Sequence, residues 1–109
     1  MKASDLMIRC LEEEGVERIY GVPGEENADF MISLINSHIE FILCRHEQAA
    51  AFMADAYGRL TGKAGVCLGT LGPGVTNLLT GIADGNMDRA PLVAIIGQGS
   101  TKRLHKESH

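Results

Sequence analysis

The sequence predicts an α/β fold with three layers (α/β/α), in which helices cover both faces of a parallel sheet. Four short segments are almost continuously apolar, which is typical of strands buried on both faces of a parallel sheet. They alternate strictly with segments whose apolar residues recur at helical spacing, and glycine-rich turns separate the two kinds of segment. The expected strands are residues 18–22, 40–44, 66–70 and 92–97, and the expected helices are about residues 5–14, 27–36, 47 onward and 75–86.

The first helix has a start signal, a stop signal and an apolar side. Ser4 can cap its N-terminus, and Gly15 stands where the helix should stop. Met7, Cys10 and Leu11 are spaced to share one face. The later helices have similar apolar sides: Phe30, Met31, Leu34 and Ile35 in the second, and Leu78, Leu79 and Ile82 in the fourth.

Length and composition limit the classes of protein to which the chain can belong. Its 109 residues allow one domain at most, and 45% hydrophobic residues suffice for a packed core. No long apolar run is free of charges, so we expect no membrane span. The N-terminus lacks the apolar core of a signal peptide, so we expect a cytoplasmic protein. The net charge of −4 offers no basic surface for nucleic acid.

Two further features concern the oxidation state of the cysteines and the completeness of the domain. The three cysteines form no CxxC pair, so Cys10, Cys44 and Cys67 are expected to be reduced and buried. A parallel sheet of four strands that ends on a strand of central character is incomplete for this fold class. We therefore expect the domain to be truncated.

Glu47 stands at the junction between the second strand and the long third helix. In a parallel sheet this junction lies at the carboxyl edge of the strands, where ligands bind. A carboxylate at this position either complements the positive end of the helix or takes part in chemistry. The residue pattern leaves both interpretations open.

A glycine-rich segment, residues 58–64, is similar in composition to a phosphate-binding loop. Its glycine spacing is one residue short, and Ala64 occupies the position where a Ser or Thr would bind Mg²⁺. The segment also follows a helix rather than a strand. We therefore interpret Gly62 as a helix stop.

Two strand-to-helix turns are candidate ligand sites. Residues 69–77 combine a strand end, a glycine-proline turn and a helix start, whose free amides could hold an anion or the polar edge of a ligand. The alternative is a tight turn whose glycines need positive φ angles. In the turn over residues 21–27, Glu25 and Glu26 would complement the positive end of the following helix.

Two other groups of charged residues have simple structural explanations. Asp84 and Asp88 are at helical spacing and are expected on a solvated face. His105 and His109 lie four residues apart but lack the HExxH order of a zinc site. We expect a solvated tail there, and no metal site in the chain.

Five segments occur along the chain in a fixed order: residues 20–25, 45–50, 58–62 and 72–77, and then 91–93 with 97–98. Together they resemble the N-terminal pyrimidine-binding domain of thiamine-diphosphate-dependent enzymes. Within that superfamily the chain most resembles the large, catalytic subunit of acetolactate synthase. The resemblance covers essentially the whole chain, and its strength comes from the order of the segments.

The resemblance implies a cofactor, thiamine diphosphate, and a catalytic role for Glu47. In the family, the acid at this position hydrogen-bonds N1′ of the cofactor's aminopyrimidine, which helps to remove the proton from the thiazolium C2. The first active-site loop and the segment packed near the pyrimidine also have counterparts here. The implied cofactor-binding residues are Pro23, Gly24, Glu25, Glu47, Gly72, Pro73, Gly74 and Asn77.

The implied reaction joins two units derived from a 2-keto acid such as pyruvate with loss of CO₂, in branched-chain amino acid or acetoin synthesis. In the family, the diphosphate and Mg²⁺ are bound by a Gly-Asp-Gly motif in a separate C-terminal domain of another subunit. That motif is absent from this sequence. We therefore expect residues 1–109 to be part of an N-terminal domain that is inactive alone, from a homodimer or homotetramer. Many relatives also bind FAD in a domain that this chain lacks.

Two alternatives remain. The residues Glu25, Glu26 and Asn27 replace the glycine-alanine sequence typical of biosynthetic acetolactate synthases. This difference leaves open a 2-keto-acid decarboxylase or another lyase of the same superfamily. The chain could instead be a non-catalytic interaction module with an exposed apolar patch of Met31, Phe52 and Met53.

Overall fold

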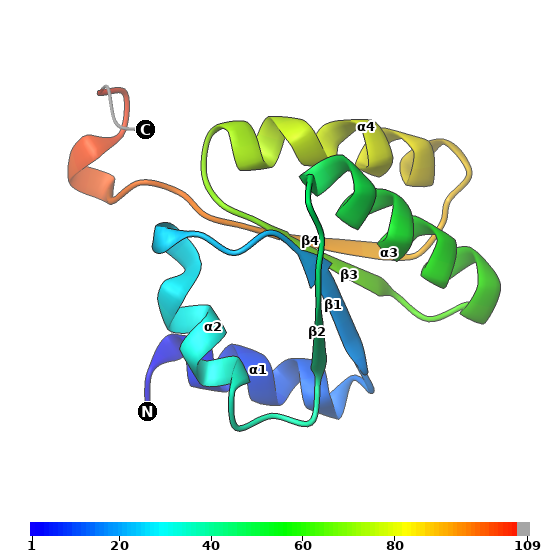
Figure 1. The fold of residues 1–109 in the computed structure, drawn as a ribbon, viewed down its shortest axis with the longest axis horizontal. Coiled ribbons are helices and arrows are strands. Elements are labelled where there is room, and N and C mark those ends of the chain that lie inside the picture. Colours follow the sequence, from blue (N-terminus) through cyan, green and yellow to red (C-terminus); the bar gives the residue numbers. More distant parts are fainter. Residues whose placement is uncertain (107–109) are drawn as a thin grey trace.

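The computed structural model describes residues 1–106, which contain a four-stranded parallel sheet with the strand order β2-β1-β3-β4 (Figure 1). The strands are β1 (Arg18–Gly21), β2 (Glu40–Leu43), β3 (Gly65–Gly69) and β4 (Leu92–Ile96). In the register, Ile19 lies opposite both Phe41 and Val66, and Val66 lies opposite Val93. All four predicted strands are present.

Helices cover both faces of the sheet and complete the predicted three-layer arrangement (Figure 1). On one face lie α1 (Ala3–Glu13) and α2 (Ala28–Leu34), and on the other lie α3 (Glu47–Thr61) and α4 (Pro73–Met87). Two short 3₁₀ turns, η1 (Glu25–Asn27) and η2 (Thr101–Arg103), precede α2 and follow β4. The predicted fold class is confirmed.

The sheet separates two hydrophobic clusters, because successive side chains of a strand point to opposite faces. In β3, Val66 and Leu68 pack with α1 and α2, whereas Cys67 packs with α3 and α4. The first cluster contains mostly large side chains and the second mostly small ones: Ile8, Ile19, Phe30, Leu34 and Ile39 in the first, and Cys44, Ala50, Ala51, Ala54 and Leu78 in the second.

The small residues allow α3 and α4 to approach closely. A Cβ on Gly81 of α4 would overlap the Cβ of Ala51 of α3, and one on Gly85 would lie 3.3 Å from Oδ1 of Asp55. The two helices run in the same direction along the sheet (Figure 1). Their first turns therefore lie at the same edge of the sheet.

The chain leaves β1 and β3 toward opposite faces of the sheet. After β1 it passes through α2 on one face to β2, and after β3 it passes through α4 on the other face to β4 (Figure 1). The carboxyl ends of β1 and β3 are neighbours and form a topological switch point, where open α/β sheets bind ligands. This position depends on the strand order, which the sequence pattern did not specify.

The predicted apolar face of the first helix is partly wrong. Met7 and Cys10 are exposed, whereas Ile8 is only 3% exposed and Leu11 packs beside it. Because α1 packs against α2 as well as over the sheet, its buried face is centred on Ile8. The exposure of Cys10 also corrects the expectation that every cysteine is buried.

The predicted cap of the first helix is also wrong. α1 begins at Ala3, so Ser4 lies inside the helix, where its hydroxyl is 2.8 Å from that of Ser33. The helix start is closed by the side chain of Asp5, which accepts a hydrogen bond of 2.9 Å from the backbone amide of Lys2. A carboxylate in the first turn therefore replaces the expected serine cap.

Some apolar residues assigned to inner helix faces lie outside the core. Ile35 is 75% exposed because α2 ends at Leu34, and Leu79 is 51% exposed on the outer side of α4. Met31 is half-buried against the first cluster. The apolar patch proposed for an interaction module is therefore limited to Phe52 and Met53, which are exposed on α3.

Candidate functional site

The candidate residues lie at the carboxyl edge of the sheet, where three loops begin side by side. Backbone hydrogen bonds continue the strand pairing past the strand ends, from Cys44 N to Gly21 O at 2.9 Å and from Val22 N to Leu68 O at 3.3 Å. The loops after β2, β1 and β3 are therefore neighbours. They lead to Glu47, residues 23–25 and residues 72–77, respectively.

Glu47 is the first residue of α3, at the strand–helix junction where the sequence placed it. Its side chain is half-buried, and Oε2 accepts a hydrogen bond of 3.1 Å from the side-chain amide of Asn77 in α4. Among residues 1–106, no hydrogen bond to Oε1 is found. The carboxylate is thus held by one oxygen while the other can accept a bond from a ligand.

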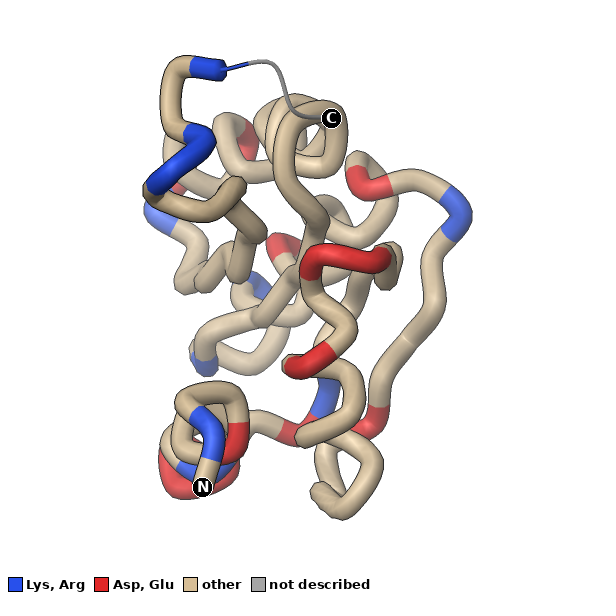
Figure 2. The backbone as a smooth tube through the Cα atoms, turned by 90° about the vertical axis from the view of Figure 1, so that its left-hand side faces the viewer, with Lys and Arg blue, Asp and Glu red and all other residues tan. Residues whose placement is uncertain are grey.

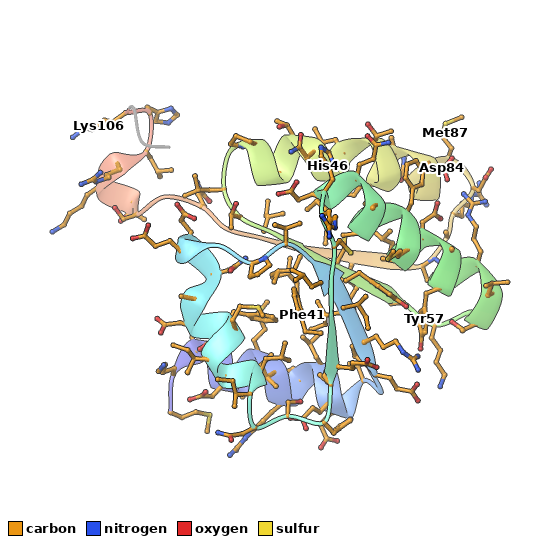
Figure 3. All side chains as sticks on the ribbon, in the orientation of Figure 1. Phe41, His46, Tyr57, Asp84, Met87 and Lys106 are labelled. Carbon is orange, nitrogen blue, oxygen red and sulfur yellow. The ribbon has the colours of Figure 1, made fainter. Side chains whose placement is uncertain are left out.

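His46 caps the N-terminus of α3, a role that the sequence analysis missed. Its backbone is extended, with φ of −152°, and its Nδ1 accepts a hydrogen bond of 3.0 Å from the backbone amide of Gln48. Nδ1 therefore acts as the acceptor that satisfies one of the free amides at the start of the helix. Histidine is not among the usual N-caps, so its position directly before the helix was the only available signal. Figure 3 shows His46 at the start of α3.

The loop after β3 is a tight turn. Gly72 has a φ of 61°, as predicted for a glycine of this turn, and Pro73 begins α4. The backbone amide of Gly74 donates to the carbonyl oxygen of Leu71 at 3.3 Å. The amides of Val75 and Thr76 donate to the carbonyl oxygen of Gly72 at 3.0 and 3.1 Å. Local carbonyl groups already use the amides of Gly74, Val75 and Thr76, which favours the tight-turn interpretation over an anion site at these three amides.

Thr70, directly after β3, joins this turn to the first loop. A Cβ on Gly24 would overlap Cγ2 of Thr70, and one on Gly74 would lie 2.8 Å from Oγ1 of Thr70. The first loop is also closed by Asn27, which is 7% exposed and accepts a hydrogen bond of 2.9 Å from Gly24 N. Thr70 was not singled out from the sequence, and Asn27 was noted only as part of the difference over residues 25–27, because only the fold brings the two loops together.

The structure brings some of the implied site residues into contact and leaves others apart. Glu47 contacts Asn77 directly, and Gly24 and Gly74 both meet Thr70. The remaining residues belong to the same two loops and are exposed: Pro23, Glu25, Gly72 and Pro73.

A second polar cluster joins α3 to α4 at their C-terminal ends. Nε of Arg59 donates to Oδ1 of Asp55 at 2.8 Å, and Nη1 donates to Oδ2 of Asp88 at 2.7 Å. Nη2 donates to the carbonyl oxygen and to Oδ2 of Asp84, at 3.1 and 3.2 Å. Asp84 and Asp88 are exposed, as expected for a solvated face, with 49% and 62% of their side chains accessible, and both also bind Arg59.

The pKa values of two carboxyls in this cluster are displaced in opposite directions. The hydrogen bond from Arg59 holds the pKa of Asp55 below its usual value. A hydrogen bond shared with Asp55 raises the pKa of Asp84. Asp55, which is 3% exposed, therefore keeps its negative charge to a lower pH than Asp84 does.

The glycine-rich segment after this cluster is a helix stop, as predicted. Gly62 ends α3 in the left-handed conformation, with φ of 74°. Gly58 lies within α3, where a Cβ would overlap the carbonyl oxygen of Pro91. A phosphate-binding loop is therefore excluded here, since the segment is helical.

The remaining charged side chains of residues 1–106 include no metal-binding group. His105 is exposed, and His109 lies outside the described residues. In residues 1–106, no group of His, Cys, Asp and Glu side chains is arranged to hold a metal ion. Figure 2 shows basic residues on the segment that leads to the C-terminus and interspersed charges elsewhere. None of the described helices is long and apolar enough to cross a membrane.

Comparisons with known proteins agree with the resemblance seen in the sequence. The family model "Thiamine pyrophosphate enzyme, N-terminal TPP binding domain" matches residues 1–109. A probable acetolactate synthase large subunit of Methanococcus aeolicus is 46% identical over 108 residues, which are 99% of this chain and 18% of the relative.

Two bacterial relatives give the same result. The acetolactate synthase isozyme 2 large subunit of Escherichia coli is 45% identical over 92% of this chain and 18% of its own length. The acetolactate synthase of Bacillus subtilis is 46% identical over 99% of this chain and 19% of its own length. The chain thus spans less than a fifth of the curated relatives it matches. By the match over its whole length, this chain belongs to the family of N-terminal TPP-binding domains of thiamine pyrophosphate enzymes.

Proposed function

We propose that this chain is the pyrimidine-binding part of a thiamine-diphosphate-dependent enzyme of the acetolactate synthase type. The observation that carries the proposal is the half-buried carboxylate of Glu47, held by Asn77 at the carboxyl edge of the sheet. A charge that only complements a helix end needs no partner from a second helix. A carboxylate that must present one oxygen to a ligand in a fixed direction does need such a partner.

The residues at this edge fit the aminopyrimidine half of the cofactor. A ring nitrogen of an aminopyrimidine needs a hydrogen-bonding partner, and the free Oε1 of Glu47 can supply it. Gly24 and Gly74 have no room for a side chain because Thr70 occupies the space that a Cβ would need, so the two loops can approach each other beside Glu47. When bound, the cofactor would supply the carbanion chemistry that protein side chains lack.

In this proposal the residues of the chain bind and orient the ring. Glu47 would hold a proton at N1′ through Oε1, while the hydrogen bond from Asn77 to Oε2 keeps the carboxylate in a fixed direction. The half-buried setting limits competition from water, so the hydrogen bond to the ring is stronger than it would be in solvent. Two loops would enclose the ring: residues 23–25 on one side and residues 72–74 on the other.

We further infer that residues 1–109 are the N-terminal domain of a longer polypeptide. The share of the relatives that the chain matches, 18–19% of their length, supports this inference. The central and C-terminal domains would lie elsewhere in that polypeptide. A second subunit of a homodimer or homotetramer would contribute the diphosphate-binding domain with Mg²⁺, and any FAD would lie outside this domain.

The proposed reaction joins two units of pyruvate, or of a related 2-keto acid, with loss of CO₂, in branched-chain amino acid or acetoin synthesis. The acetolactate synthases among the relatives support this choice. The acidic pair Glu25 and Glu26 in the first loop favours the second candidate, a 2-keto-acid decarboxylase or another lyase. Both residues are exposed in η1, so their positions do not distinguish an acetolactate synthase from a decarboxylase. The reaction product distinguishes the two enzymes.

The test of the proposed function uses the complete polypeptide that contains this chain, with thiamine diphosphate, Mg²⁺ and pyruvate. We expect acetolactate as the product, whereas acetaldehyde would indicate the decarboxylase. Glu47→Gln should abolish product formation while the protein stays folded by circular dichroism. Glu40→Gln, at the opposite end of β2, is the matched control and should leave activity unchanged. An active Glu47→Gln enzyme would overturn the role of Glu47.

The 109-residue chain separately tests the proposal that it carries only the pyrimidine-binding half of the cofactor site. We expect no CO₂ from the chain with pyruvate, thiamine diphosphate and Mg²⁺, and measurable release would contradict the need for a second domain. Binding of 4-amino-5-hydroxymethyl-2-methylpyrimidine should shift the NMR signals of Glu47 and Asn77 in a saturable manner. The absence of saturable shifts at these two residues would argue against pyrimidine binding at this edge.

A further inference from the structure

The interface between α3 and α4 has polar contacts at its two ends. At the N-terminal end, Asn77 donates to Glu47 at 3.1 Å. At the C-terminal end, Arg59 binds Asp84 of α4 and Asp88, the residue directly after α4. Figure 3 shows Asp84 near the end of α4, far along the helix pair from the start of α3. The two contacts therefore act on the same pair of helices from opposite ends.

Between these ends, glycines of α4 make the closest approach to α3. Gly81 lies against Ala51, and Gly85 lies against the side chain of Asp55. Helices set their relative position by packing ridges of side chains into grooves. Where the side chains are this small, the ridges are shallow and oppose a shift along the helix axes only weakly. The polar ends must therefore contribute to the register between α3 and α4.

Arg59 has the geometry to set that register. Its planar guanidinium carries donors in fixed directions: Nε binds Asp55 within α3, Nη2 binds Asp84 of α4, and Nη1 binds Asp88 at the C-cap of α4. Asp55 is 3% exposed, so it fixes the orientation of Arg59 from a buried position. A bond to the backbone carbonyl oxygen of Asp84 ties Arg59 to the helix itself and not only to a movable side chain.

We propose that Arg59 is a positioning residue that fixes α4 against α3 and thereby sets the position of Asn77 relative to Glu47. Arg59 and Glu47 are twelve residues apart in one helix, about 18 Å along its axis. A displacement at one end reaches the other because each helix moves as a rigid element. The consequence for a bound cofactor rests on the proposed function, whereas the mechanical link between the two contacts does not.

The test compares NMR spectra of the 109-residue chain with and without Arg59→Met. We expect the side-chain amide signals of Asn77 to shift and its nuclear Overhauser contact with the Glu47 side chain to be lost or weakened. Arg9→Met, on α1 at the opposite face of the sheet, is the matched control and should leave both observations unchanged. A role limited to stability would lower the denaturation midpoint without moving the Asn77 signals.

Two milder variants keep the test decisive if Arg59→Met does not fold. Arg59→Lys keeps the charge but loses the planar fork, and Asp88→Asn weakens one exposed contact of 2.7 Å. Both should move the Asn77 signals in the same direction as Arg59→Met. Unchanged Asn77 signals in every folded variant would overturn the proposal. No cofactor is present, so this outcome is separate from the success or failure of pyrimidine binding.

Discussion

Replacement of Gly81 by alanine tests how closely α3 and α4 must approach. A Cβ at this position would overlap the Cβ of Ala51 and would lie 2.9 Å from both the carbonyl carbon of Ala51 and the backbone nitrogen of Phe52. Rotation of a side chain cannot relieve contacts with backbone atoms. Gly81→Ala should therefore push α4 away from α3.

The expected magnitude follows from two opposing effects. Alanine stabilises the interior of a helix relative to glycine by about 0.5–1 kcal/mol. Overpacking in a tight interior costs about 1–3 kcal/mol, and contacts with backbone lie at the upper end because the neighbours cannot give way. We expect a net loss of about 1–2 kcal/mol for Gly81→Ala, since overpacking exceeds the gain in helix propensity.

Thermal and urea denaturation of the 109-residue chain measure this loss, and about 1 kcal/mol lowers the Tm of a domain of this size by about 4–8 °C. Gly85→Ala is the matched control in the same helix. Its nearest neighbour, at 3.3 Å, is a side-chain atom of Asp55, so its stability should stay within about 1 kcal/mol of the parent. If Gly81→Ala were as stable as Gly85→Ala, the close helix approach described above would be incorrect.

Three further predictions concern the core, the polar cluster and Glu47. Leu78 is 0% exposed, so Leu78→Ala should cost about 2–5 kcal/mol in urea denaturation, whereas Leu79→Ala, at a position 51% exposed, should cost far less. The pKa of Asp55 is lowered from its usual value of 3.8. Its contribution to the free energy of unfolding should therefore be fully present above pH 3.8 and should be lost as the pH falls through the lower pKa of the folded state. Asp84, whose pKa is raised, acts in the opposite sense: its contribution to the free energy of unfolding is lost as the pH rises through its folded-state pKa. In denaturation midpoints measured against pH, Asp55→Asn should remove the loss of stability that Asp55 causes at low pH. Glu47→Gln should change the stability of the 109-residue chain by less than about 1 kcal/mol, and a larger change would show that Glu47 does more than complement the helix end and bind Asn77.

The hydrophobic patterns were sufficient to predict the class of fold and every strand. Continuous apolar runs are possible only where both faces of a strand are covered, so the pattern already indicated a parallel sheet between two helix layers. Local boundaries were less certain: Ser4 was expected as a cap, but the helix begins at Ala3. The buried face of α1 was also misplaced, because contact with α2 decides which of its apolar residues are covered.

The candidate site was also predicted in part from the sequence and in part only from the fold. Glu47 was identified from its place at a strand–helix junction and from the order of the neighbouring motifs. Its hydrogen bond with Asn77 joins residues thirty positions apart in the sequence. The two loops meet at Thr70 because β1 and β3, which are not consecutive in the chain, are neighbours in the sheet. Asp84 and Asp88 were expected on a solvated face from their spacing, and both are exposed. Their common partner, Arg59, could not be identified from the sequence because it belongs to another helix.

By itself, the sequence determined which segments are helices and strands, that the sheet is parallel, and that one carboxylate stands at its carboxyl edge. These properties depend on residue spacing and on turn residues, which are local along the chain. The tertiary structure decided the strand order, the close packing of α3 on α4, and the partners of Glu47 and Arg59. These depend on contacts between residues far apart in the chain, whose geometry exists only after the helices have packed on the sheet.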